Sequence, residues 1–375
     1  MTLALAYHTW ADGLTRQFSW SPDRVALHLL NDASLDSVVV ANPLRSQLER
    51  LRRRGHDADE GFPHLPRRHL LQPRRWRRQD NPSVQTSMET YRRLDQWLAS
   101  ASRRLGQERP VLVSCHPVLA AVAEDEHWSD VVYYGWDDWL SYPRHSHVTD
   151  LVARSYELMA QRQVNVIGVT RAIVDRIGSP RGSVVPNGIS AVDHEPGAAV
   201  VPSWFDELVE PVALYVGALQ ERVDVDAVRR LALDLPEWQV VLVGPLQDPP
   251  RFATLADLPN VHVMPPQPRP VVLEMMSRAT VCLIPHRRTP MSEAMSPLKL
   301  YEYLAAGATV VATDLEPMRG VSERCLLVEE GAALAPAVIA ARALPRPTAD
   351  ELADFRSAHD WSHRYQDWRV AALGR

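Results

Sequence analysis

Residues 295–313 read MSPLKLYEYLAAGATVVAT, which has the pattern of a loop, a helix and then a strand. Pro297 suits the first turn of a helix, and Gly307 suits the position just after its end. The apolar run from Thr309 to Ala312 has the length of a buried strand. A helix that leads directly into such a strand is the repeating unit of a parallel sheet, so this stretch predicts an α/β domain.

The same alternation continues on both sides of this stretch. Residues 181–202 lose the periodicity and collect proline and glycine, which is typical of a connection between domains. We therefore predict two doubly wound, Rossmann-like domains. The predicted strands are Leu3–Tyr7, Ser37–Val40, Pro110–Ser114, Asp130–Tyr134 and Val164–Val169, then Val212–Val216, Gln239–Val243, Val261–Met264, Val281–Ile284, Thr309–Ala312 and Cys325–Val328. The predicted helices include Tyr91–Leu105, Val148–Arg162 and the tail Ala349–Leu373.

Composition limits the class of protein. A chain of 375 residues with 46% hydrophobic residues is long enough for two cores. Its three cysteines, Cys115, Cys282 and Cys325, lack metal-ligand spacing, so neither a disulfide framework nor a zinc site is expected. Without a recognisable signal peptide or membrane span, we expect a cytoplasmic protein.

The charge is unevenly distributed. The net charge is −5, yet eleven arginines face four acids between Arg45 and Arg78, so this segment carries +7. It suits peripheral contact with the anionic inner surface of a membrane, or it is a solvated loop. Nucleic acid is not expected as a partner, because no recognition motif accompanies the charge.

Lysine is nearly absent. Of the 41 basic residues, only Lys299 is a lysine, and it lies within residues 295–313. Base composition of the genome explains the many arginines, and one lysine can persist by chance. The alternative is a site that needs a compact ammonium. Lys299 lies where the first N–H groups of a helix favour phosphate, and Glu302 follows one turn later, within reach of a ribose.

At these residues the sequence resembles the retaining glycosyltransferases of the GT-B architecture, in particular family 4 and its subgroup with a Ser-Pro-Leu-Lys donor loop. The resemblance extends from about Val164 to Trp361. It includes four motifs in the family's order: Val185-Pro186-Asn187-Gly188-Ile189, Tyr215-Val216-Gly217, Val241-Leu242-Val243-Gly244 and the segment from Ser296 to Gly307.

The resemblance implies two domains that face a central cleft. We expect an acceptor-binding domain over residues 1–195, joined by the C-terminal helix 356–375, and a donor-binding domain over residues 196–355. A nucleoside-diphosphate sugar would be the donor, with no metal or other cofactor required. The Asp-x-Asp sequences at 57–59 and 224–226 look incidental, because one falls in a basic loop and the other opens a helix.

The resemblance also implies roles for individual residues. Arg222 and Lys299 would neutralise the leaving diphosphate, and Glu302 would bind the ribose. The first glutamate of the family's pair falls on Ala294, with Glu293 one residue early, so the chain departs from the pattern there. Capping of a helix is the simpler explanation for the donor segment taken alone. The expected donor-site residues are Gly217, Arg222, Gly244, Ser296, Pro297, Leu298, Lys299 and Glu302.

Candidates for the acceptor side follow two strands of the first domain. His116 comes after one strand, and Asp137 and Asp138 come after the next, where a parallel sheet places its ligands. His116 could contact the transferred sugar, and either aspartate could act as a base. The structural alternatives are a packed histidine and helix-capping aspartates. By resemblance, Gly13 lies in the first acceptor-side loop.

These observations predict a glycosyltransferase that moves a sugar to a hydroxyl acceptor, with retention of configuration. The acceptor would be a small molecule, a glycolipid or a glycan. Two alternatives remain: an epimerase or hydrolase of a nucleotide sugar, and a binding subunit without catalysis, which Ala294 suggests.

Overall fold

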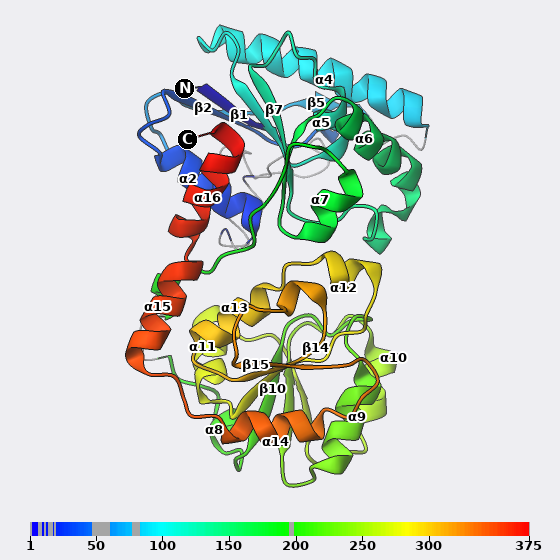
Figure 1. Cartoon of the computed structure of the whole chain (residues 1–375), viewed down its shortest axis with the longest axis vertical. Coiled ribbons are helices and arrows are strands. Elements are labelled where there is room, and N and C mark those ends of the chain that lie inside the picture. The colour runs from blue at the N-terminus through cyan, green and yellow to red at the C-terminus, as the bar shows by residue number, and fades with distance from the viewer. Residues whose placement is uncertain are drawn as a thin grey trace. The chain divides into compact units, whose positions relative to one another are not determined.

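The computed structural model describes residues 2–6, 10, 13, 18, 20–46, 61–76, 83–194 and 199–374. It divides into two compact units, residues 1–186 with 364–375, and residues 187–363. Each is built on one large parallel sheet (Figure 1). The α/β class with parallel sheets that we predicted is therefore confirmed.

The first unit is built on a seven-stranded sheet in the order β4-β2-β1-β6-β7-β8-β9. All its paired strands are parallel. Strands β2 and β4 are added on one side of β1, and the strands from β6 onward are added on its other side. The strands are β1 (Thr2–Ala6), β2 (Ser37–Ala41), β4 (Arg68–Leu71), β6 (Val111–Ser114), β7 (Asp130–Gly135), β8 (Asn165–Gly168) and β9 (Gly182–Val184), beside a separate pair, β3 (Arg45–Ser46) and β5 (Arg74–Arg75).

Helices pack against this sheet through apolar faces. Helix α4 begins at the cap residue Ser83, whose hydroxyl accepts from the Thr86 N–H, and it packs beside α5 and α6. Helix α16 lies against α2, where Tyr365 stacks on His28 at 5.0 Å and donates a hydrogen bond to Asp32. The helices are α2 (Ser21–Asn31), α4 (Val84–Arg104), α5 (Pro117–Val122), α6 (Thr149–Gln161), α7 (Arg171–Ile177) and α16 (Trp361–Leu373).

The second unit is built on a six-stranded parallel sheet in the order β12-β11-β10-β13-β14-β15. Strands β11 and β12 are added on one side of β10, and β13 to β15 are added on its other side. The strand order therefore reverses between β10 and β13, as in a doubly wound nucleotide-binding fold. The strands are β10 (Val212–Val216), β11 (Gln239–Val243), β12 (Val261–Met264), β13 (Val281–Ile284), β14 (Val310–Thr313) and β15 (Cys325–Val328). The helices are α8 (Ser203–Asp206), α9 (Val225–Asp234), α10 (Pro249–Phe252), α11 (Arg269–Arg278), α12 (Pro290–Ala294), α13 (Leu298–Ala305), α14 (Ala335–Ala343) and α15 (Ala349–His359).

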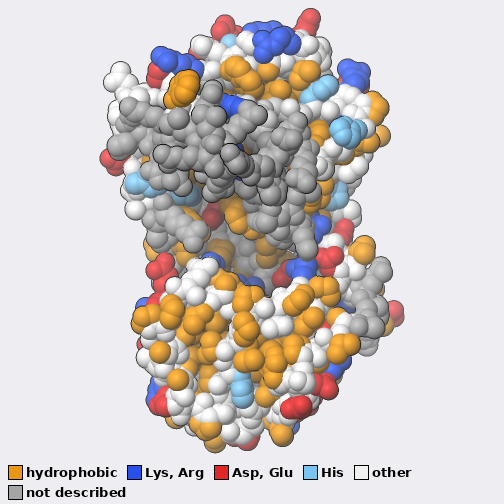
Figure 2. Space-filling view, turned by 180° about the vertical axis from the view of Figure 1, so that it is seen from behind, with side chains coloured by type: hydrophobic (Ala, Val, Ile, Leu, Met, Phe, Trp, Pro, Cys, Tyr) orange, Lys and Arg blue, Asp and Glu red, His pale blue; other side chains and the backbone are white. Residues whose placement is uncertain are grey.

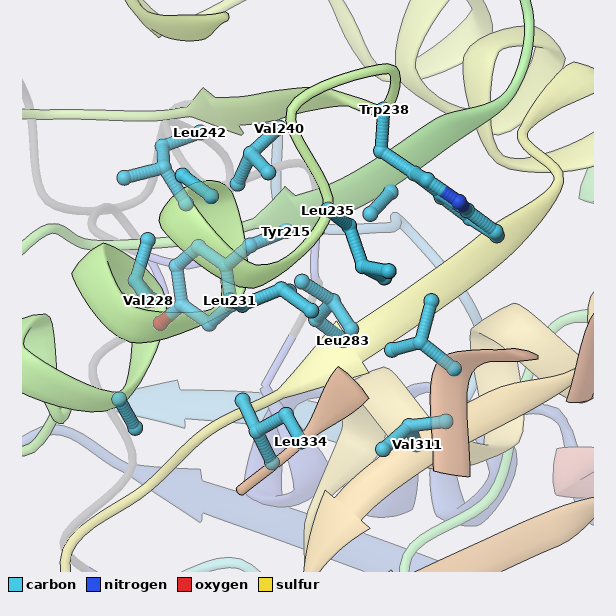
Figure 3. Close-up of a cluster of buried hydrophobic side chains, with 14 of the residues drawn as sticks. Tyr215, Val228, Leu231, Leu235, Trp238, Val240, Leu242, Leu283, Val311 and Leu334 are labelled. Carbon is cyan, nitrogen blue, oxygen red and sulfur yellow. The ribbon is translucent and has the colours of Figure 1, made fainter. Parts of the chain in front are cut away.

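Alternate side chains of these strands form two apolar cores, one on each face of the sheet. On one face the Tyr215 ring lies among apolar side chains of α9 and β11, including Val228, Leu231 and Leu242 (Figure 3). Seen from behind, hydrophobic side chains also reach the surface of this unit (Figure 2). The interior positions of strand β10 are thus held by packing on both sides.

The two connections between the units are hydrogen-bonded to each other. The Ile189 N–H donates to the His359 carbonyl at 2.9 Å, and the Trp361 N–H donates to the Ile189 carbonyl at 2.8 Å. Residues 187–194 and 356–363 therefore belong to the second unit, whereas we had expected boundaries after residues 195 and 355.

The described helices include none that is both long enough and apolar enough to cross a bilayer.

Candidate donor-binding site

The candidate site lies in the second unit, at the carboxyl ends of the strands next to the reversal between β10 and β13. Ligands of doubly wound sheets bind at this point. Val216 pairs with Val243, so Gly217 and Gly244 follow neighbouring strands side by side. The sequence analysis assigned both glycines to the donor site, and the structure brings them together.

The two glycines allow an approach that no other residue would permit. A Cβ atom on Gly244 would lie 2.0 Å from the Gly217 carbonyl oxygen. A Cβ atom on Gly217 would lie 2.1 Å from Cε of Lys299, and its φ of +143° is itself unfavourable for other residues. Gly217 therefore leaves the space that the Lys299 side chain occupies, and Gly244 leaves the space for the backbone of Gly217.

Lys299 is half-buried in the first turn of α13, and its ammonium lies 5.5 Å from the centre of the Tyr215 ring. Among the described residues, no carboxylate lies within ion-pair distance of it. Burial and the nearby Arg222, partly opposed by Glu302, together lower the pKa of Lys299 to about 8. A cation that is kept close to another cation without an acidic partner is suited to an anionic ligand.

Arg222 is the second cation of the site. Its guanidinium lies 3.0 Å from Sδ of Met295, a weak acceptor that leaves most of its donors available to stronger ones. With the Gln220 amide in its better orientation, the amide oxygen also accepts from Arg222. The loop after β10 thus holds Arg222 near Lys299, as the resemblance implied.

The segment before α13 serves partly to hold the backbone. The Ser296 hydroxyl accepts from the Asn187 N–H at 3.2 Å, and the Ser296 carbonyl accepts from the Asn187 amide at 3.0 Å. Pro297 caps α13, so the helix begins at Leu298 and not at Pro297. The Leu300 N–H donates to the Pro297 carbonyl, so the N–H groups of Leu298 and Lys299 precede the first hydrogen bond of the helix and are suited to a phosphate.

Glu302 lies one turn further along α13 and already has a cationic partner. Arg269 donates to Glu302 at 2.7 Å and to Asp193 at 2.9 Å. Burial works to lower the pKa of Arg269, but the two carboxylates outweigh it and hold the pKa above its ordinary value. The ion pair orients the Glu302 carboxylate. Glu302 was expected at the site from the sequence, whereas Arg269, which positions it, was not.

The position of the missing glutamate is closed. Ala294 is buried at 2% exposure in α12, and Glu293 pairs with Arg288 at 2.5 Å. Glu293 also accepts from the Glu316 N–H at 3.1 Å. Glu293 is therefore engaged in holding the loop after β14, which argues against its replacing the absent carboxylate.

Asp224, from the second Asp-x-Asp sequence, caps α9 by accepting from the Ala227 N–H at 3.0 Å. The other such sequence, residues 57–59, lies outside the described residues, as does much of the basic segment 45–78. Within the described part of that segment, Arg68 donates to the carbonyls of Leu30 and Asp32, so at least one of its arginines has a structural role.

In the first unit, the acceptor-side candidates lie at the carboxyl ends of β6 and β7 and are well packed. His116 is 2% exposed, stacks on Tyr91 and shares a 3.1 Å hydrogen bond with the Tyr91 hydroxyl. Asp138 is 1% exposed and is held by Arg176 and Ser141. These contacts account for the burial of both side chains, and Asp138 holds the turn after β7 instead of capping a helix. Asp137 accepts from the Asp138 N–H at 3.0 Å and is half-buried.

A separate group in the first unit has the composition of a metal site. Asp95, Glu124 and His127 lie close together. However, the Asp95 carboxylate accepts from His127, from the Trp128 indole at 2.6 Å and from the Glu124 N–H at 3.2 Å. Glu124 and His127 come just before β7, so the group lies at the amino ends of the strands, whereas His116 lies at their carboxyl ends. These hydrogen bonds give the group a structural role.

Comparisons with known proteins agree with this geometry. Residues 210–343 match the family model "Glycosyl transferases group 1". A stretch of 103 residues is 33% identical to a Bacillus subtilis (strain 168) protein assigned by name to teichuronic acid biosynthesis as the glycosyltransferase TuaH. That match covers 27% of this chain and 26% of the relative.

Solved glycosyltransferase structures share the fold over the whole chain. Anabaena Alr3699/HepE in complex with UDP has a TM-score of 0.63 at 14% identity, with all of both chains covered. A glycosyltransferase from Rickettsia africae has a TM-score of 0.66 at 11% identity, covering 100% of this chain and 99% of that one. Sucrose-phosphate synthase from Thermosynechococcus elongatus has a TM-score of 0.60 at 17% identity, covering 100% and 97%. The chain therefore has the GT-B fold, and residues 210–343 of its second unit are similar to the glycosyl transferases group 1.

Proposed function

We propose that the protein is a glycosyltransferase that moves a sugar from a nucleoside-diphosphate sugar to a hydroxyl acceptor. The observation that carries the proposal is Lys299, a half-buried ammonium beside Arg222 at the point where doubly wound sheets bind ligands. The match of residues 210–343 to glycosyltransferases supports the same activity. UDP bound to HepE, and UDP-glucose bound to the same protein, support a nucleotide sugar as donor.

In the proposed reaction, the bond between the sugar C1 and the diphosphate oxygen breaks as the acceptor hydroxyl bonds to C1. Lys299, Arg222 and the first N–H groups of α13 stabilise the negative charge that gathers on the departing diphosphate. The acceptor's proton passes to a phosphate oxygen of that leaving group, on the face that it has just left. The attack therefore occurs with retention, and the two cations supply the charge that a metal would otherwise supply.

Glu302 binds the ribose hydroxyls in this proposal, because Arg269 holds its carboxylate in one orientation. His116 and Asp137 are proposed for the acceptor side, with Asp138 holding the loop after β7. We propose a small molecule, a glycolipid or a glycan as acceptor, in the cytoplasm. The arginine-rich segment 45–78 is proposed to contact an anionic membrane surface.

A binding subunit without catalysis is the second candidate function. The buried Ala294, where the related enzymes have a glutamate near the transferred sugar, favours it. Such a subunit would bind the nucleotide as tightly as the enzyme and would release no nucleoside diphosphate from the sugar nucleotide.

The test is thermal unfolding of the purified protein with UDP, GDP, ADP and their glucose conjugates, with magnesium and with EDTA. Stabilisation by one nucleotide series, equal in magnesium and EDTA, is expected, because a ligand of the native state raises its stability by RT ln(1 + [L]/Kd). If no nucleotide stabilises the protein, the proposed donor site is refuted. Release of nucleoside diphosphate in the presence of acceptors then separates the enzyme from the binding subunit.

A further inference from the structure

His286 lies next to the proposed donor site and has no role in the reaction described above. His286 lies two residues after the end of β13, which is the strand next to β10 at the point where the strand order reverses. An isolated antiparallel bridge joins it to Val223, and the Arg287 N–H donates to the Arg222 carbonyl at 2.8 Å. The backbone thus holds His286 against the loop that carries Arg222.

The imidazole of His286 is buried and lacks hydrogen-bond partners. Its exposure is 1%, and neither Nδ1 nor Nε2 has a partner among the described residues. A buried polar group without a partner is rare, because it loses its hydrogen bonds to water without replacement. Such a group at the edge of a ligand site points to a role in another state of the protein.

The charged groups that face His286 from the adjoining elements are both cations. Lys299 reaches it from α13 and Arg222 from the loop after β10, while Tyr215 of β10 presents its ring 6.1 Å away. The acids at the start of the adjoining α9 are used elsewhere: Asp224 caps the helix, and Asp226 pairs with Arg287 at 3.6 Å. Burial, Lys299 and Arg222 together hold the pKa of His286 well below its ordinary value. The imidazole is therefore neutral in the empty protein.

We infer that His286 is a positioning residue that takes up a proton when the diphosphate of the donor binds to Lys299 and Arg222. The inference rests on the proposed function. In the empty site, a neutral imidazole permits the two cations to lie close together. A diphosphate brings negative charge that outweighs both cations, so protonation of the imidazole becomes favourable and adds a third positive charge behind them.

The proton comes from solvent, and no bond other than N–H forms. Because the His286 pKa is higher in the complex than in the empty protein, binding takes up a proton at any pH between the two values. Nucleotide affinity then rises as pH falls, by at most about tenfold per pH unit for one proton.

The experiment is calorimetric titration of the protein with UDP at pH 7 in buffers of different ionisation enthalpy, repeated between pH 6 and 8. The wild type is compared with His286→Phe and with His286→Gln, which keeps hydrogen-bonding atoms but does not titrate. His262→Gln is the matched control, because His262 lies on β12 and pairs with Gln239 away from the site. Subtraction between proteins removes the protons that UDP itself exchanges.

We expect more proton uptake in the wild type and in His262→Gln than in either His286 variant, and a steeper rise of affinity with falling pH. Equal uptake in all four proteins would overturn the inference while leaving the donor site intact. If UDP, GDP and ADP all give no binding heat and no thermal stabilisation, the proposed function itself fails. If His286→Phe does not fold, His286→Gln decides the comparison.

We expect the wild type and His262→Gln to take up equal numbers of protons, and His286→Phe and His286→Gln to take up fewer. Uridine, which lacks phosphate, should cause no difference among the four proteins, because it brings no charge to Lys299 and Arg222. A difference that persisted with uridine would also overturn the inference.

Discussion

Replacing Lys299 with methionine should stabilise the empty protein and weaken nucleotide binding at the same time. The pKa of Lys299 falls from 10.5 to about 8 on folding. Since one pKa unit corresponds to about 1.36 kcal/mol, the charged ammonium opposes folding by about 3 kcal/mol at pH 7. Methionine keeps the unbranched shape without the charge. Part of the gain is lost with the contact to the Tyr215 ring, so we expect a net gain of about 1–3 kcal/mol.

The sign of the pH dependence follows from the same shift. Below pH 8 Lys299 is charged in both the folded and the unfolded chain, so the full penalty is present. Above pH 8 the unfolded chain binds a proton that the folded chain has lost, and the stability of the wild type rises with pH. The advantage of Lys299→Met should therefore shrink as pH rises and be small by about pH 10.

The assay is thermal unfolding of wild type and variant between pH 7 and 10, with and without UDP. Loss of a charged hydrogen bond should weaken UDP binding by about 1.5–3 kcal/mol, or roughly tenfold to a hundredfold and more. Arg230→Met, which removes an exposed charge from α9, is the control and should change neither quantity. A Lys299→Met protein that is less stable when empty, or that binds UDP as the wild type does, would refute the reasoning.

Three further predictions concern the same unit. Gly217→Ala should weaken UDP binding about as much as loss of Lys299, because the new Cβ displaces the Lys299 side chain. Gly320→Ala also introduces a Cβ at a positive φ, but into open space, and should bind normally; titration calorimetry compares the two variants. Arg269→Met should weaken UDP binding by about 1–3 kcal/mol through disorder of Glu302, with little change for inorganic pyrophosphate, and equal losses for both ligands would contradict the ribose assignment. EDTA should leave the UDP affinity of the wild type unchanged, and a loss that magnesium restores would contradict the proposal that no metal is needed.

Most of the fold could be predicted, because strands buried on both faces of a parallel sheet are continuous apolar runs. The predicted bounds of β10, β11, β12, β13 and β15 agree with the structure. Two edge strands were missed for a physical reason. Strand β4 lies in the arginine-rich segment and reads Arg-His-Leu-Leu, and β9 reads Gly-Ser-Val, so neither has the apolar run of a central strand.

In the tail, a contact with a residue distant in the sequence interrupts the helix that the local pattern predicted. A single helix was expected over Ala349–Leu373, but the structure has two, α15 and α16, separated at Asp360. Asp360 is extended because it bridges to Ile189, and its carboxylate accepts from the Ala191 N–H at 2.8 Å. No helical periodicity within the tail carries information about a partner 169 residues away.

The candidate site could be predicted only in part. Gly217, Gly244, Arg222 and Lys299 come together as the motifs implied, because each follows or precedes an element whose place in the sheet is fixed by topology. The missed residues, Arg269 and His286, have no motif of their own. Their roles depend on the side chains that surround them, which only the folded chain brings into view.

The solitary lysine also has a practical consequence for work with this protein. Apart from a terminal amine, Lys299 is the chain's sole aliphatic amine, and its pKa of about 8 leaves much of it unprotonated and nucleophilic in mildly alkaline buffer. Amine-directed dyes, crosslinkers and activated surfaces will therefore be directed to the proposed donor site. Bioconjugation by these routes would inactivate the molecules that it attaches, unless a bound nucleotide shields the amine during coupling.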